Sequence, residues 1–441
     1  MSRGKVLRRR QRGMTKRVLI FFPHNLSTPR TGAHKRGLEI LHGLNEIGCE
    51  VGLASSTLST DTPWQSASVE SLKDRCSHVY VYEATQADLA YRARLQHYYQ
   101  PNYLWLPIVR RLHPLGHREP PFNTRIHTPP SMRRWFDEVV EQFAPDIIVM
   151  NYAYWDRLID HARLKSVVRI IDTIDLISLN KEMQNAIRKW LPDPLSIKGV
   201  SDELLREDFF ETQDISASPG EFRIYDQYNY CIAIAATEAE MIRRNTRRTH
   251  VTLLPMTQEP RFIVNHYDGP ALFPVGPNLF NTQGYLSFVN RVLPQVLRSA
   301  PEFILKVTGF YENIIPRETV EGVEFAGFLP SLQEAYEHAR FAICPVFGGT
   351  GQQVKIVEAM AYGVPVVAFR PAAERSPLQH QVNGLVANNS EEFATHVATL
   401  WNDRDMCRKL GRAARETIAN GFSRETLLKS LAGMIEPSVQ S

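Results

Sequence analysis

Phe347-Gly-Gly-Thr-Gly-Gln-Gln-Val-Lys-Ile-Val-Glu-Ala-Met-Ala-Tyr-Gly-Val-Pro-Val-Val-Ala-Phe369 is the stretch of sequence that decides the fold. The apolar run 341–347 leading into it predicts a buried strand, and the glycines that follow predict a turn. A helix is expected from Gln353 to Tyr362, because a glycine and a proline follow it directly. The apolar run 366–369 predicts a second strand. The N-terminus of the helix therefore lies behind a glycine loop, an arrangement suited to binding an anion.

Two charged side chains share one face of the expected helix, because Lys355 and Glu358 are three residues apart. A lysine in the first turn opposes the helix dipole, and its presence makes sense if a bound anion supplies the missing negative charge. Glu358 precedes a run of packing residues, which places its carboxylate at the edge of a pocket. From the residues alone, a surface ion pair beside a tight turn is an equally good interpretation.

The stretch GTGQQVKIVEAMAYGVPVVAF resembles the donor-nucleotide motif of the retaining glycosyltransferases of family 4, which have the GT-B fold. The resemblance covers most of residues 17–435. It implies an α/β protein with two Rossmann-like domains that face each other across a cleft. It also implies transfer of a sugar from a nucleotide-sugar donor to a glycan, lipid or other hydroxyl acceptor, with retention of anomeric configuration.

The resemblance assigns roles to the residues of the motif. The candidate catalytic residues are Glu358 on the ribose, Lys355 on the diphosphate, and Thr350, where many members have a second glutamate that contacts a donor-sugar hydroxyl. Three further groups are donor-binding candidates. Gly349, Gly351 and Gln352 belong to the glycine loop, and Gly327, Phe328 and Leu329 form the expected nucleobase site. Gly276 ends the first expected strand of the donor domain. Relatives often place an arginine and a lysine after that glycine, but residues 277–284 contain neither.

Candidates on the acceptor side lie in the first half of the chain. Gly32 stands where the family has a glycine in the loop after its first strand, and His34 follows it; a helix-surface histidine is the alternative. Asp172 and Asp175 follow the expected strand 167–171, at the edge where open α/β sheets bind ligands. Capping of the next helix by either aspartate is an equally good interpretation.

Length and composition are compatible with this interpretation. The 441 residues suffice for two domains, and a net charge of +4 argues against a general nucleic-acid binder. We expect a basic disordered leader (1–15), an acceptor domain (16–258), a donor domain (259–421) and a C-terminal helix that crosses back to the first domain (422–441).

The expected location is cytoplasmic, because the sequence shows no signal peptide or membrane-spanning stretch and its five cysteines are scattered. The basic leader could contact anionic lipid at the inner face of the membrane. No cofactor or metal is expected, because Lys355 and the helix N-terminus can balance the phosphate charge.

Two other functions stay open at this point. One is an epimerase or phosphorylase on the same two-domain fold. The other is a nucleotide-sugar-binding subunit that has lost turnover, which Thr350 and the missing Arg/Lys pair would fit. Detectable sugar transfer with any donor would exclude the second.

Overall fold

The computed structural model describes residues 15–29, 31–60, 62–98, 123–309, 314–329 and 331–435. Nearly all of the expected basic leader lies outside these ranges, so the structure does not test it.

The first sheet has seven strands in the order β3-β2-β1-β4-β5-β6-β7. Apolar runs such as Val18–Phe21 and Ile147–Met150 are buried, as expected of parallel strands covered on both faces. The order reverses between β1 and β4, as it does in doubly wound α/β sheets. The strands are β1 (Arg17–Phe21), β2 (Glu50–Ser56), β3 (His78–Tyr82), β4 (Ile147–Asn151), β5 (Val168–Asp172), β6 (Tyr230–Ala233) and β7 (His250–Leu253).

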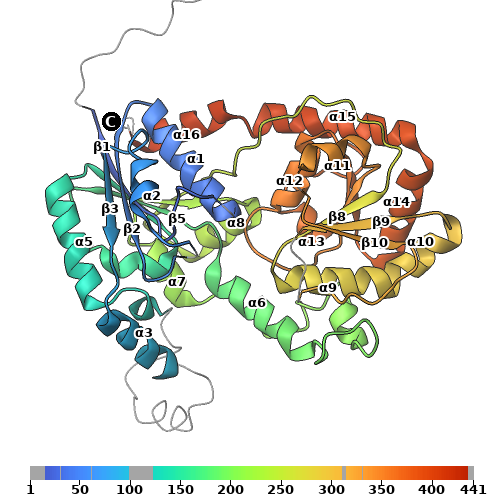
Figure 1. The fold of residues 1–441 in the computed structure, drawn as a ribbon, viewed down its shortest axis with the longest axis horizontal. Coiled ribbons are helices and arrows are strands. Elements are labelled where there is room, and N and C mark those ends of the chain that lie inside the picture. Colours follow the sequence, from blue (N-terminus) through green and yellow to red (C-terminus); the bar gives the residue numbers. More distant parts are fainter. Residues whose placement is uncertain are drawn as a thin grey trace, which may run out of the picture. The chain divides into compact units, whose positions relative to one another are not determined.

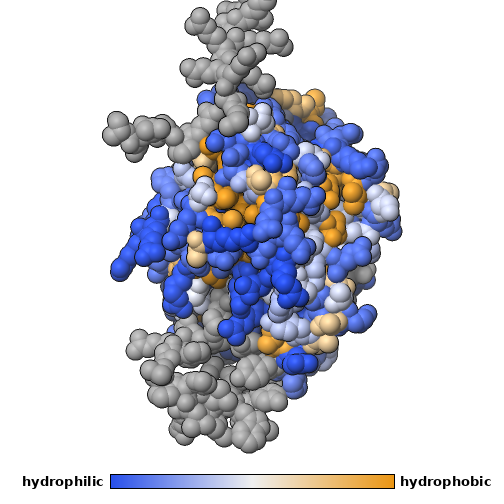
Figure 2. Space-filling model, turned by 90° about the vertical axis from the view of Figure 1, so that its left-hand side faces the viewer, coloured by the Kyte–Doolittle hydropathy of each residue, from blue (hydrophilic) through white to orange (hydrophobic). Residues whose placement is uncertain are grey.

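Helices alternate with these strands along the chain. They are α1 (Gly32–Glu46), α2 (Ser66–Glu70), α3 (Gln86–Tyr98), α5 (Pro130–Phe143), α6 (Ile177–Trp190), α7 (Pro219–Tyr225) and α8 (Ala236–Asn245). Figure 1 shows α1 and α5 on opposite sides of β1, β2 and β3. Hydrophilic side chains cover most of the coloured surface in Figure 2, with hydrophobic ones in small patches between them. No helix in the described ranges combines the length and apolar character needed to cross a membrane.

The second sheet has six strands, all paired in parallel, in the order β10-β9-β8-β11-β12-β13. They are β8 (Ala271–Val275), β9 (Leu305–Gly309), β10 (Val323–Gly327), β11 (Ala342–Cys344), β12 (Val366–Phe369) and β13 (Leu385–Ala387). The order reverses between β8 and β11, so this sheet has its own switch point. Two Rossmann-like sheets of one α/β chain confirm the expected fold class.

The helices of this half are α9 (Leu279–Ser287), α10 (Leu293–Ser299), α11 (Leu332–His338), α12 (Val354–Ala361), α13 (Arg370–Ala373), α14 (Ser390–Asn402), α15 (Arg404–Gly421) and α16 (Arg424–Ile435), with a π-helical turn between α9 and α10. Helix α12 lies within the expected 353–362, and Gly363 ends it with φ +74°. The deciding stretch therefore folds as its local signals predict.

The chain forms two compact units. Unit 1 contains residues 1–112, 123–170 and 428–441, and unit 2 contains residues 113–122 and 171–427. Residues from the first half of the chain join unit 2 because Leu204 and Phe209 are buried in the core below the second sheet. Gln283 Nε2 also donates to the Leu204 carbonyl at 3.0 Å. The domain boundary expected at residue 258 stays a prediction; the change from one sheet to the other falls between β7 and β8.

Candidate donor site at the switch point of the second sheet

The glycine loop after β11 has a backbone that other residues would not adopt readily. Gly349 and Gly351 have φ +116° and +62°, in the region that L side chains rarely occupy. A Cβ at Gly348 would lie 2.3 Å from the Phe210 ring, and one at Gly349 would lie 2.3 Å from Arg375 Nη1. Both the conformation and the close packing therefore require glycine.

A buried arginine holds the glycine loop through hydrogen bonds to its carbonyl oxygens. Arg375 is only 6% exposed and donates to the carbonyl oxygens of Gly348 at 2.7 Å, Thr350 at 3.3 Å and Pro371 at 2.9 Å. Burial lowers the pKa of its guanidinium to about 10. Sequence reasoning missed Arg375, because it lies 25 positions after Thr350 in a segment without a recognisable motif.

Lys355 lies at the switch point, where it joins α12, which follows β11, to α9, which follows β8. Its Nζ donates to Asn281 Oδ1 at 2.7 Å. Asn281 is held in turn, because its Nδ2 donates to the Gly276 carbonyl at 2.8 Å and to Asn278 Oδ1 at 2.9 Å. Burial lowers the pKa of Lys355 to about 8. A desolvated cation beside two strand ends is a suitable partner for a phosphate.

The other donor-binding candidates differ in their exposure and contacts. Glu358 follows Lys355 by three residues on α12 and is partly exposed. Gln352 accepts a hydrogen bond from the Met256 amide at 2.8 Å, so it also fixes the segment that joins the two sheets. Gly327 ends β10 with φ +69°, and Phe328 beside it is 64% exposed. Their roles, and that of Leu329, stay predictions.

Asp175 lies against the glycine loop. Thr350 Oγ1 donates to Asp175 Oδ1, and Asn180 Nδ2 donates to Asp175 Oδ2 at 2.8 Å. Ile174, just before it, has φ +58°, which is strained for a β-branched residue. The sequence placed Asp175 on the acceptor side; in the structure it contacts a residue of the donor loop.

The side chain of Glu221 caps the N-terminus of α6 from α7. Its carboxylate accepts the amide hydrogens of Ile177 at 3.0 Å and Ser178 at 2.9 Å. Asp172 ends β5 and is fully buried. Asp175 accepts the amide hydrogen of Leu176, the N-cap residue of α6, so the alternative that an aspartate caps this helix stays open.

Three carboxyl groups lie near one another in this region: Glu221 and Glu238 are buried, and Asp175 is partly covered. Burial raises the pKa of Asp175 to about 7 and also raises the pKa values of Glu221 and Glu238; repulsion from neighbouring carboxylates adds to the effect at Asp175 and Glu238. Arg375 is the cation that opposes this shift at Asp175. Among the described residues, no group of three or more His, Cys, Asp or Glu side chains is arranged to hold a metal ion.

The two candidates in unit 1 lie at the start of α1. Gly32 is its first residue, and an added Cβ there would meet nothing within 4 Å. His34 is 1% exposed, and its Nδ1 lies 2.7 Å from the Oγ1 of the capping residue Thr31. The alternative of a helix-surface histidine is therefore wrong. Its catalytic role stays a prediction.

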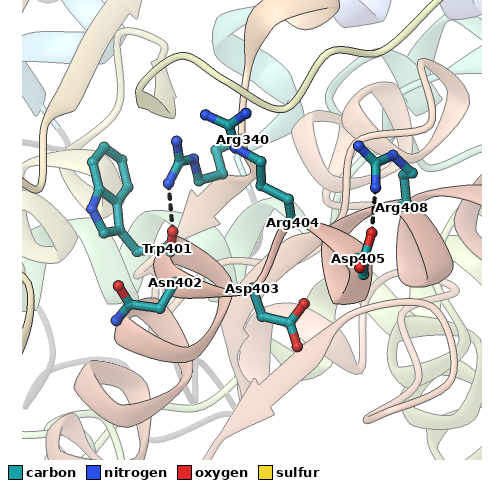
Figure 3. A pocket seen from close by; sticks show the side chains of 7 residues that line it. All are labelled: Arg340, Trp401, Asn402, Asp403, Arg404, Asp405 and Arg408. Carbon is teal, nitrogen blue, oxygen red and sulfur yellow. Dashed lines mark hydrogen bonds and ion pairs between the residues drawn. The ribbon is translucent and has the colours of Figure 1, made fainter.

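A separate pocket of about 460 Å³ lies elsewhere in unit 2. It is lined by Arg340, Trp401, Asn402, Asp403, Arg404, Asp405 and Arg408 (Figure 3). Arg340 lies 4.4 Å from the centre of the Trp401 ring and donates to its carbonyl, while Arg408 pairs with Asp405. No residue of the glycine loop lines this pocket, so it is distinct from the candidate donor site.

Sequence comparison finds a family match in the second half of the chain. Residues 270–403 match the family "Glycosyl transferases group 1". An uncharacterized 44.6 kDa protein in the cps region of Klebsiella pneumoniae is 28% identical over 133 residues, which cover 27% of this chain and 34% of that protein. An uncharacterized glycosyltransferase of Haemophilus influenzae is 22% identical over 192 residues, or 41% and 53% of the two chains. The chain thus spans about a third to a half of the length of these curated relatives.

Structural comparison covers nearly the whole chain. Sucrose-phosphate synthase from Thermosynechococcus elongatus has a TM-score of 0.59 at 14% identity, covering 96% of this chain and 98% of that one. TarM has a TM-score of 0.60 at 11% identity, covering 96% and 99%. HepE from Anabaena, solved with UDP and glucose, has a TM-score of 0.52 at 13% identity, covering 96% and 100%.

At these identities the structural matches define the fold class, which is GT-B. Residues 270–403, which include the glycine loop and α12, match the glycosyl transferases group 1 family model, which covers less than half of the chain.

Proposed function

We propose that the protein is a retaining glycosyltransferase that takes a sugar from a nucleotide-sugar donor and transfers it to a hydroxyl of a glycan or lipid acceptor. The observation that carries this proposal is the Lys355–Asn281 hydrogen bond of 2.7 Å. It places a partly buried cation in the first turn of α12 against Asn281 of α9, at the switch point of the second sheet and after the glycine loop. In open α/β sheets this is the place where phosphate-bearing ligands bind.

The geometry suggests how the donor would react. Lys355 and the N-terminal amides of α12 would balance the charge that develops on the diphosphate as the bond to the sugar breaks. Glu358 would hold the ribose. The departing diphosphate oxygen would take the proton of the incoming hydroxyl, because it gains negative charge as its bond to the sugar breaks.

UDP is the nucleotide to test first, because HepE and TarM were both solved with it. The position of the K. pneumoniae relative in a cps region supports a polysaccharide acceptor. On the acceptor side, Gly32, His34 and Asp172 stay the candidate residues.

Incubation with radiolabelled UDP-sugars and bacterial glycan or lipid extracts would test the proposed function. Transfer of label to the extract together with release of UDP is expected. Free UDP with no labelled product would favour an epimerase or a hydrolytic activity. Binding of UDP without turnover under any condition would favour a subunit that has lost catalysis.

Glu358→Gln is expected to weaken donor binding and leave the fold intact. Glutamine keeps the size of the side chain but removes the charge that strengthens hydrogen bonds to two ribose hydroxyls. Donor affinity should fall by about 1.5–3 kcal/mol, with little change in melting temperature. Calorimetry with UDP measures the first quantity and a thermal melt the second. Unchanged affinity in a less stable variant would make Glu358 structural.

We further propose that the basic leader gives the protein salt-sensitive attraction to anionic membranes at the cytoplasmic face. Its clustered Arg and Lys residues are screened over about 10 Å at 0.1 M salt. Co-sedimentation with phosphatidylglycerol vesicles should therefore decrease when residues 1–15 are deleted or when salt is raised. Equal binding of the full-length and shortened proteins at low salt would rule this out.

A further inference from the structure

Asp175 approaches the backbone of the glycine loop from a distant part of the chain. Its Oδ1 lies 3.4 Å from the position that a Cβ at Gly351 would occupy. It accepts a hydrogen bond from Thr350 Oγ1, and Thr350 also lies 3.3 Å from Asn180 Nδ2. A carboxylate and an amide from α6 and the loop before it thus meet the part of the loop where a donor sugar is expected.

The carboxylate of Asp175 has unused capacity to accept hydrogen bonds. A carboxylate offers about four acceptor positions on its two oxygens. The Thr350 hydroxyl, the Asn180 amide group and the Leu176 backbone amide occupy three of them, which leaves about one for a ligand. The group is only partly covered by protein, so a ligand beside the loop can reach it. Gln352 Nε2, on the same loop, is a buried donor with no hydrogen-bond partner among the described residues.

We propose that Asp175 accepts a hydrogen bond from a hydroxyl of the donor sugar, and that it is a specificity-determining residue of the donor site. This rests on the proposed function, since it requires a nucleotide sugar in the loop. Thr350 and Asn180 position the carboxylate, and the left-handed turn at Ile174 directs it toward the loop. A sugar with a hydroxyl at the contacted position gains a charge-assisted bond, and its deoxy analogue loses it.

The charges around Asp175 give this contact a pH dependence. Glu221 and Glu238 face it with negative charge, Asp172 lies three residues before it, and Arg375 faces it from below the loop. Because the pKa of Asp175 is raised to about 7, the carboxylate is largely protonated at pH 6 and ionised at pH 8. Protonation removes acceptor capacity. The extra affinity for a UDP-sugar over UDP should therefore be lost as the pH falls through about 7.

The test compares the wild-type protein with Asp175→Asn, an isosteric change. Calorimetry measures affinity for UDP, UDP-glucose and UDP-N-acetylglucosamine at pH 6 and pH 8. At pH 8 the variant should bind the preferred UDP-sugar roughly 10-fold or more weakly, the range for hydrogen bonds to a charged group, while UDP affinity changes less than about twofold. Asp214→Asn, at an exposed aspartate of the same unit, is the matched control and should change neither affinity.

The outcomes separate this assignment from the proposed function. A wild-type protein that binds neither UDP nor any nucleotide sugar overturns both. Wild-type binding of UDP and UDP-sugar with the same preference in Asp175→Asn overturns the role of Asp175 alone. The wild-type pH profile is a second measurement that does not depend on a variant folding. If the preference for UDP-sugar over UDP is the same at pH 6 and pH 8, Asp175 does not contact the sugar.

Discussion

Arg375→Met is expected to destabilise unit 2 by about 3–5 kcal/mol, the range for removing one partner of a buried charged network. Methionine fills much of the same space but donates no hydrogen bonds. The carbonyl oxygens of Gly348 and Thr350 would lose their shared donor, and Asp175 would lose its compensating positive charge. A buried polar group without a partner keeps its full desolvation cost.

Urea denaturation, followed by intrinsic fluorescence, measures this loss. Arg370→Met is the matched control, because Arg370 is exposed on the adjacent helix α13 and donates to Asn388 at the surface. Its effect should stay within about 1 kcal/mol. Arg375→Lys should recover only part of the stability, because one ammonium cannot reach three carbonyls as a guanidinium does. Equal denaturation midpoints for Arg375→Met and Arg370→Met would contradict the supporting role of Arg375.

Lys355→Ala is expected to weaken UDP binding by about 1.5–3 kcal/mol and uridine binding hardly at all. The lysine would neutralise the diphosphate, which uridine lacks. It is also the cation that joins α12 to α9 at the switch point. Calorimetry with both ligands measures the difference. Lys409→Ala, at an exposed lysine on α15, is the control and should bind both ligands as the wild type does. Equal losses for UDP and uridine would show that Lys355 acts on the fold.

The pKa of Lys355 gives the same interaction a pH signature. Because burial lowers this pKa to about 8, the ammonium is charged below pH 8 and loses its proton above it. UDP affinity of the wild type should therefore fall between pH 8 and pH 9.5. The Lys355→Ala variant should show no such fall in this range. A flat wild-type profile would mean that the ammonium does not contact the diphosphate.

The sequence by itself determined the strand, glycine loop, helix and strand of residues 342–369. These elements depend on local properties of the backbone: Gly349, Gly351 and Gly363 adopt positive φ, Pro365 prevents the helix from continuing, and apolar runs form buried parallel strands. The candidate roles of Lys355 and Glu358 came from their spacing on one helix and from the family motif. Such signals lie within a few residues of one another, so they can be read without knowing the fold.

Only the tertiary structure decided which groups support the loop. Arg375 lies 25 residues from Thr350, and Asp175 lies 175 residues from it, yet both contact it. Asn281, which holds Lys355, belongs to a helix 74 residues earlier, and Glu221 caps α6 from 43 residues away. The contacts of Lys355 with Asn281 and of Arg375 with the glycine loop form because the parallel strands β8, β11 and β12 bring their carboxyl ends to one edge of the second sheet. The contacts of Asp175 and Glu221 depend instead on the packing of segments that follow β5. The residues next to an arginine or an aspartate in the sequence do not indicate which carbonyl or hydroxyl it will contact in the folded protein. These partners are therefore determined by the topology and by burial.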